Sequence, residues 1–140
     1  MKIGAGAYSL DDQVGYLLRR VTQRHLSIFS AAIPQLTTTQ FAALAKLAEL
    51  GPQSQNVLGR ATSMDAATIK GVVDRLARDG LVETAADPDD RRRLTVSLTA
   101  AGAGLFASTV NSALQVTAAT LSPLNSDEQA LLAALLSRLA

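Results

Sequence analysis

Cysteine is absent from the 140-residue sequence, and histidine occurs once. Without cysteine the chain cannot form a disulfide, a thiolate metal site or a thiol redox switch. The longest uncharged stretch, 94–126, is interrupted by polar residues, glycine and proline, so it does not predict a membrane-spanning helix. Met1–Ala7 does not resemble a signal peptide, because it has no apolar core segment. We therefore expect a cytoplasmic protein that does not contact the membrane.

Groups suited to catalysis are scarce as well. The sequence offers no second histidine beside His25, no Gly-rich phosphate loop and no acidic pair on an otherwise apolar face. The acidic run Asp87–Asp90 is not followed by the glycine and the glutamate that a calcium-binding EF-hand loop needs at its sixth and twelfth positions. We expect no enzyme activity, no metal site and no cofactor.

Apolar residues are plentiful enough for one core. The chain is 48% hydrophobic, which at this length fits a single domain spanning 1–140. Its 13 basic and 12 acidic residues leave a net charge of +1. Between Arg60 and Arg93 the sequence has seven basic and seven acidic residues. Any electropositive surface there depends on the placement of charges and not on an excess of them.

Helical spacing of apolar residues predicts that most of the chain is α-helical. We expect a long first helix at 10–31, stopped by Pro34. A second helix should begin at the Thr37–Thr39 cluster, which supplies an N-cap, and end at Gly51.

The centre of the chain predicts a winged helix-turn-helix. A short helix at 54–60, a turn, and a longer helix that begins at Asp65 and ends at Gly80 form the helix-turn-helix. Strand candidates at 81–84 and 94–98 flank a charged tip and predict a β-hairpin, or wing. The fold class is therefore mainly α with a small β wing, and the winged helix-turn-helix region spans 36–98.

Two more helices are expected after Thr99, separated by Pro123, and the second opens with a capping box at Ser126–Gln129. The last helix carries a stripe of leucines that needs a partner. It can pack against the first helix of the same chain, but terminal helices around a central winged unit favour a dimer interface. We expect dimerisation helices within 8–33 and 99–140, flanking the winged region.

The helix after Asp65 has two different faces. Ile69, Val72, Val73 and Leu76 cluster on one side and should face the core. The opposite face begins with small residues and is basic overall, so it suits an approach to the floor of a DNA major groove. Close helix packing is the alternative reason for a glycine there. The candidate DNA contacts on this helix are Ala67, Thr68, Lys70, Gly71 and Arg75.

Two other places supply candidate DNA contacts. Short polar residues at the start of the preceding helix suit phosphates, although such residues also serve simply as caps. Three arginines at the wing tip can follow a phosphate backbone or enter a minor groove, and the aspartate before them is expected to brace one of them. A solvated charged turn is the alternative for the tip. These candidates are Ser54, Gln55, Asn56, Asp90, Arg91, Arg92 and Arg93.

The single histidine lies on the apolar stripe of the first helix. A lone histidine in such a place is usually structural. An imidazole with arginines nearby on the same helix and two aromatic rings within reach also suits a small aromatic acid. The candidate effector residues are Tyr16, Arg20, His25 and Phe29.

Three segments resemble the MarR family of bacterial transcriptional regulators: Leu36–Phe41, Asp74–Val82 and Asp87–Thr99. The most specific parts are Gly80-Leu81-Val82 after a helix end and the Asp-x-Arg unit of the wing, here Asp90 and Arg92. The likeness spans nearly the whole chain. It implies a homodimer, built from the first, fifth and sixth helices, that binds double-stranded DNA at a palindromic operator. It also implies that the fourth helix enters the major groove and the wing arginine the minor groove.

The resemblance implies a mode of regulation as well. Family members usually repress, and many release DNA when a small phenolic or aromatic acid binds between the dimer and DNA-binding regions. Segments 13–20, 23–25 and 54–56 are similar to repressors of nicotinate or related aromatic catabolism. The lack of cysteine removes the thiol-oxidation branch of the family. The alternative function is a winged-helix protein-interaction module without sequence-specific DNA binding.

Overall fold

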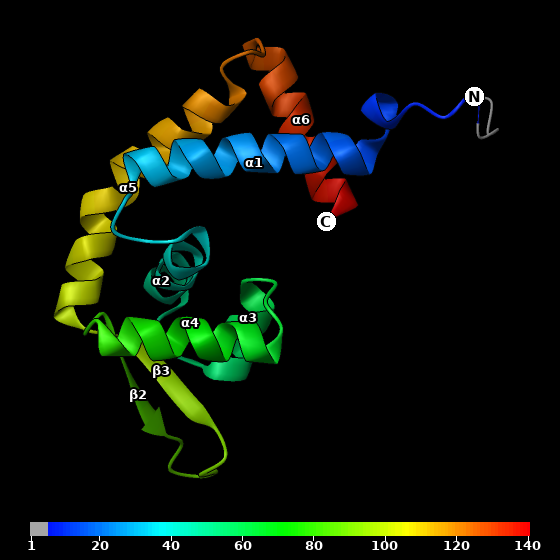
Figure 1. The fold of residues 1–140 in the computed structure, drawn as a ribbon. Helices are drawn as coiled ribbons and strands as arrows, with labels where there is room; N and C mark the ends of the chain where they lie inside the picture. The colour runs from blue at the N-terminus through cyan, green and yellow to red at the C-terminus, as the bar shows by residue number, and fades with distance from the viewer. Residues whose placement is uncertain (1–5) are drawn as a thin grey trace. The chain divides into compact units, whose positions relative to one another are not determined.

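The computed structural model describes residues 6–140 and contains helices and one small sheet (Figure 1), which confirms the predicted fold class. Residues 1–5 of the Met1–Ala7 segment considered above lie outside the described part. The chain divides into two compact units. One unit comprises 33–113, and the other comprises the described residues up to Ala32 together with 114–140. No helix within 6–140 has both the length and the apolar character needed to cross a membrane.

Helix α2 (Thr38–Leu50) begins the central unit at a capping box. The Thr37 hydroxyl accepts a hydrogen bond from the backbone N–H of Gln40 at 3.2 Å, and the Gln40 side chain accepts one from the N–H of Thr37 at 3.0 Å. The helix ends at Gly51, whose φ of 77° is a conformation that glycine adopts without strain. The predicted start and end of this helix are confirmed.

Helices α3 (Gln55–Ala61) and α4 (Ala66–Arg78) form the predicted helix-turn-helix. Asp65 caps α4 by accepting a hydrogen bond from the N–H of Thr68 at 2.7 Å. Gly80 follows its end with a φ of 75°. The core side of α4 is also as predicted: the buried residues of the two helices are Leu58, Gly59, Ile69, Val72, Val73 and Leu76.

The wing consists of β2 (Val82–Ala86) and β3 (Leu94–Leu98), which pair antiparallel, with β2 packed beside α4 (Figure 1). A third strand, β1 (Gln53–Ser54), pairs with the other edge of β3, so the sheet order is β1-β3-β2. A strand of two residues is too short to show the alternation of polar and apolar side chains by which strands are predicted. For this reason β1 was not predicted from the sequence.

Helix α5 (Ala100–Leu121) starts at the predicted cap, Thr99. The Thr99 hydroxyl accepts a hydrogen bond from the N–H of Gly102 at 3.0 Å and donates one to the carbonyl of Gly80 at 2.6 Å. A Cβ atom on Gly102 would overlap the carbonyl oxygen of Leu81. The start of α5 is therefore fastened to the turn that follows α4.

The second unit contains a short 3-10 turn (Leu10–Asp12), α1 (Val14–Ala32), the end of α5 and α6 (Ser126–Leu139). The first helix predicted at 10–31 is thus divided in two at Gln13. Arg24 of α1 donates hydrogen bonds to the last carbonyls of α5, those of Thr120 at 2.7 Å and Ala119 at 2.9 Å. This guanidinium caps the carbonyl end of α5.

The predicted capping box of the last helix is wrong by one residue. Asn125 caps α6, accepting from the N–H of Glu128 at 2.9 Å, and the Glu128 side chain accepts from the N–H of Asn125 at 2.9 Å. The sequence holds two overlapping boxes, Asn-x-x-Glu and Ser-x-x-Gln. The second is not formed because the Gln129 side chain instead donates to the carbonyls of Leu121 and Leu124.

Candidate nucleic-acid interface

The outward face of α4 is open. Ala67, Thr68, Lys70 and Arg75 are exposed. A Cβ atom built on Gly71 meets no atom within 4 Å, so close packing does not account for this glycine. Because Ala67 and Gly71 have small side chains or none, the backbone of α4 is accessible to another surface beside them.

Charges on α4 are partly paired. Lys70 Nζ lies 2.8 Å from Asp74 Oδ2, with side chains 67% and 55% exposed. Arg75 makes no ion pair within 6–140, so its guanidinium is available to an anion. At the start of the helix, the hydrogen bond from the backbone N–H of Thr68 holds the pKa of Asp65 below its ordinary value, and a weaker contribution comes from the Thr68 side chain. Asp65 is therefore ionised at neutral pH and caps α4 as a carboxylate.

The start of α3 and the wing come together. Ser54, Gln55 and Asn56 line a small depression of about 60 Å³ with Arg92 and Arg93. Ser54 also caps α3, accepting from the N–H of Val57 at 3.2 Å. The polar residues 54–56 and two wing arginines, which were predicted as separate candidates, thus line the same depression.

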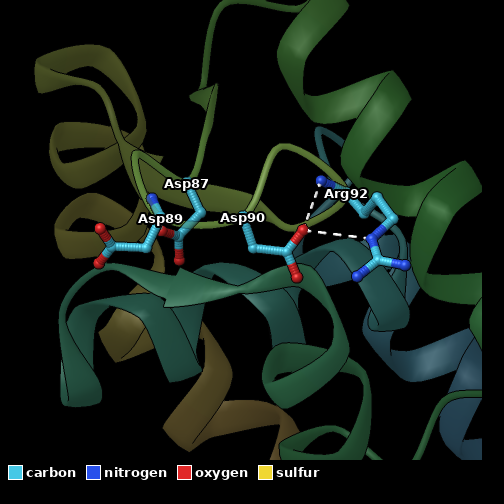
Figure 2. A network of polar contacts seen from close by, with 4 residues as sticks. All are labelled: Asp87, Asp89, Asp90 and Arg92. Atoms are coloured by element: carbon cyan, nitrogen blue, oxygen red, sulfur yellow. Dashed lines mark hydrogen bonds and ion pairs between the residues drawn. The ribbon is translucent and has the colours of Figure 1, made fainter.

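The wing tip is ordered by its own aspartates (Figure 2). Asp90 Oδ1 accepts hydrogen bonds from the backbone N–H of Arg92 at 3.0 Å and from its Nε at 3.3 Å, so the expected bracing of an arginine is confirmed. Asp87 Oδ1 accepts from the N–H of Asp89 at 2.8 Å. The Arg92 side chain is 92% exposed, and its Nη groups make no hydrogen bond within 6–140. Arg91 and Arg93 are exposed as well. The tip therefore presents three guanidinium groups to solvent.

His25 lies in the other unit, at a cavity of about 450 Å³ between α1, α5 and α6. The walls are mainly apolar, and Thr22, His25, Thr117 and Thr120 contribute the polar groups. His25 Nδ1 is 2.8 Å from the Thr120 hydroxyl. The histidine thus has a hydrogen-bond partner and also faces a space large enough for a small ligand.

The other candidate effector residues lie outside the lining of this cavity. The guanidinium carbon of Arg20 is 5.9 Å from the centre of the Tyr16 ring, a cation–π contact within α1. Phe29 is buried. Sequence reasoning missed the threonines of α5, which no pattern along the helix distinguishes from its other small polar residues.

Comparisons with known proteins agree with this geometry. The MarR family profile matches residues 36–94. NicR of Pseudomonas putida, an HTH-type transcriptional repressor, is 42% identical over 134 residues, which cover 94% of this chain and 85% of NicR. The structure of Bordetella bronchiseptica BpsR, whose DNA binding is regulated by 6-hydroxynicotinic acid, is 40% identical with a TM-score of 0.91. It covers 96% of this chain and 97% of BpsR.

A third comparison involves DNA. A mutant of Escherichia coli MarR complexed with operator DNA is 25% identical with a TM-score of 0.83, covering 90% of this chain and 92% of that one. The family and the relatives are transcriptional regulators and not enzymes. With the winged helix-turn-helix in place and these relatives covering almost its whole length, the chain belongs to the MarR family of transcriptional regulators.

Proposed function

We propose that the protein is a cytoplasmic homodimeric repressor that binds a palindromic DNA operator and is released by a small aromatic acid. The observation that carries the DNA-binding part is the depression in which the start of α3 meets Arg92 and Arg93. It lies in the same compact unit as the open face of α4. A structure of E. coli MarR complexed with operator DNA supports DNA binding by this fold.

Each part of this surface has a suitable role on DNA. Gly71 leaves room for the backbone of α4 to approach the major groove, and Ala67, Thr68, Lys70 and Arg75 surround it. The short polar side chains of 54–56 suit phosphate oxygens. Arg92 presents free Nη groups to a minor groove, and Arg91 and Arg93 add charge on either side.

Dimer formation is supported by apolar surface in the second unit. Among the described residues, α6 has none that is buried, and Leu131 and Leu139 are 59% and 74% exposed. Val14 and Val21 on α1 are also exposed. A second copy related by a twofold axis would cover both helices, and it would present two α4 helices to the two halves of an inverted repeat.

Effector binding is supported by the cavity at His25. Its volume of about 450 Å³ is that of a small-molecule site, and apolar walls with one imidazole suit an aromatic ring that carries an acidic group. The response of BpsR to 6-hydroxynicotinic acid makes hydroxylated nicotinic or benzoic acids the first ligands to test.

The test of DNA binding is selection from a randomised duplex pool, followed by fluorescence anisotropy on the selected sequence. We expect an inverted repeat bound by one dimer, with the logarithm of the affinity falling by about 0.9 per contacted phosphate for each logarithm of salt. No enrichment of any sequence, together with an affinity insensitive to salt, would leave only a winged-helix module that binds another protein.

The test of the effector is a thermal-shift panel of aromatic acids. A ligand at 100 times its Kd stabilises a protein by about 2.7 kcal/mol, so a true effector should raise the Tm clearly. His25→Ala should abolish the shift, whereas Tyr16→Phe should keep it because Tyr16 does not line the cavity. Full stabilisation of His25→Ala by the same acid would remove His25 from the site.

A further inference from the structure

A single carboxylate stands on the open face of α4. Ala67, Gly71 and Asp74 follow one another at i, i+4 and i+7, so they form one line along the helix. Ala67 and Asp74 are exposed, and the space beside Gly71 is empty to 4 Å. The first functional group that a molecule approaching this line meets is therefore the carboxylate of Asp74.

The same carboxylate already holds a cation. Asp74 Oδ2 is 2.8 Å from Lys70 Nζ, and both side chains are more than half exposed. Arg75 and Arg78, the other cations of α4, make no ion pair within the described residues. Lys70 is therefore the one cation of this helix whose charge is compensated before DNA arrives. Because exposed ion pairs are weak, the Asp74 carboxylate can exchange Lys70 for another hydrogen-bond donor.

We infer that Asp74 is a specificity-determining residue, which accepts a hydrogen bond from the N4 amino group of a cytosine in the major groove and withholds Lys70 from the phosphates of other sequences. This inference rests on the proposed binding of DNA by α4.

The chemistry of the major groove selects cytosine. An ionised carboxylate only accepts hydrogen bonds, so phosphates, both guanine acceptors and the thymine carbonyl repel it. The two donors in the groove are the amino groups of cytosine and adenine. Adenine places its N7 acceptor next to its amino group, which disfavours a carboxylate, whereas cytosine has no acceptor beside N4 in this groove.

On any other sequence the carboxylate is a cost. It enters the negative potential of the duplex without gaining a hydrogen bond, and it keeps Lys70 neutralised so that the lysine releases no counterion. A repulsive group that is satisfied on one partner only is a common source of specificity. Asp74 thus lowers affinity for non-cognate DNA more than for the operator.

The test compares Asp74→Asn with the wild type by selection from a randomised duplex pool. The wild type should select a C·G pair at one symmetric position of each half-site, and Asp74→Asn should lose that preference by roughly 5- to 150-fold, the range of one base contact. On a scrambled duplex the variant should bind several-fold more tightly, with a salt slope steeper by about 0.9 per freed lysine.

Glu49→Gln is the matched control. It removes the same charge from another exposed pair, Lys46 with Glu49 at 3.5 Å, on α2 and outside the proposed DNA-binding face. Its selected sequence and salt slope should equal those of the wild type. Asp74→Ala is a second variant without the carboxylate, and its high helix propensity keeps α4 folded.

Three outcomes would overturn the inference. Selected sequences that are identical for the wild type and both Asp74 variants would exclude a base contact. If the Asp74 variants gain affinity equally on the selected and the scrambled duplexes, Asp74 is a general repulsive charge without base preference. If the wild type itself selects no sequence, the proposed function fails and the inference fails with it.

Discussion

Replacing Arg92 with alanine removes an almost fully exposed guanidinium of the wing and little else. The side chain is 92% exposed, and its only partner within 6–140 is Asp90, with 3.3 Å between Nε and Oδ1. A pair in such a position contributes at most about 1 kcal/mol to folding and often nothing measurable. We therefore expect the Tm of Arg92→Ala to stay close to that of the wild type.

The same change should weaken DNA binding severely. One arginine that reads DNA contributes about 1–3 kcal/mol, and the proposed homodimer would place two wings on its operator, so the expected loss is about 2–6 kcal/mol. Since about 1.4 kcal/mol corresponds to a factor of ten, the Kd should rise by roughly 30-fold to 10⁴-fold.

Anisotropy titrations of the selected operator, at several salt concentrations, measure this loss. Arg91→Ala is the neighbouring control, because Arg91 carries the same charge but is not held by Asp90. An unchanged Kd for Arg92→Ala would refute the assignment of the wing to DNA. An equal loss in Arg91→Ala would show that the tip acts through its total charge and not through Arg92.

Three further changes test the fold around these surfaces. Gly102→Ala should lower the free energy of unfolding by about 1–3 kcal/mol, since its methyl group overlaps the backbone carbonyl of Leu81. Gly104→Ala is the control, because a Cβ atom there meets no atom within 4 Å. Urea denaturation measures the free energy of unfolding of both variants. The bond from Thr68 lowers the folded pKa of Asp65, so its stabilising charge is present above about pH 4 and is lost as pH falls through the folded pKa. Asp65→Asn keeps an acceptor that does not titrate, and its Tm should fall less than that of the wild type on acidification. Leu135→Asp on the exposed stripe of α6 should turn the proposed dimer into a monomer in sedimentation experiments. A dimer that survives would place the interface elsewhere.

Local features were predictable because neighbouring residues decide them. Asp65 and Gly80 mark the two ends of α4 through short-range hydrogen bonds and a positive φ, and both were read correctly from residue type. The wing followed from two strand segments around a charged turn, and the bracing of Arg92 by Asp90 needs only two residues of separation.

Long-range contacts were not predictable in the same way. Arg24 of α1 caps the end of α5, a helix that begins far along the chain. Arg20 and Tyr16 contact each other, and no pattern along α1 distinguishes that contact from a shared ligand site. Strand β1 exists because β3 offers it an edge, which only the folded sheet provides.

The hold of Asp90 on Arg92 has an entropic consequence. Immobilising a long side chain on binding costs about 0.5–1.5 kcal/mol. Here one carboxylate oxygen binds both the backbone N–H and Nε of the arginine, so part of that ordering takes place when the wing folds. The affinity gained from Arg92 therefore depends on a neighbour that need never touch DNA. Removing Asp90 would leave the contact between Arg92 and DNA chemically possible and make it costlier to form.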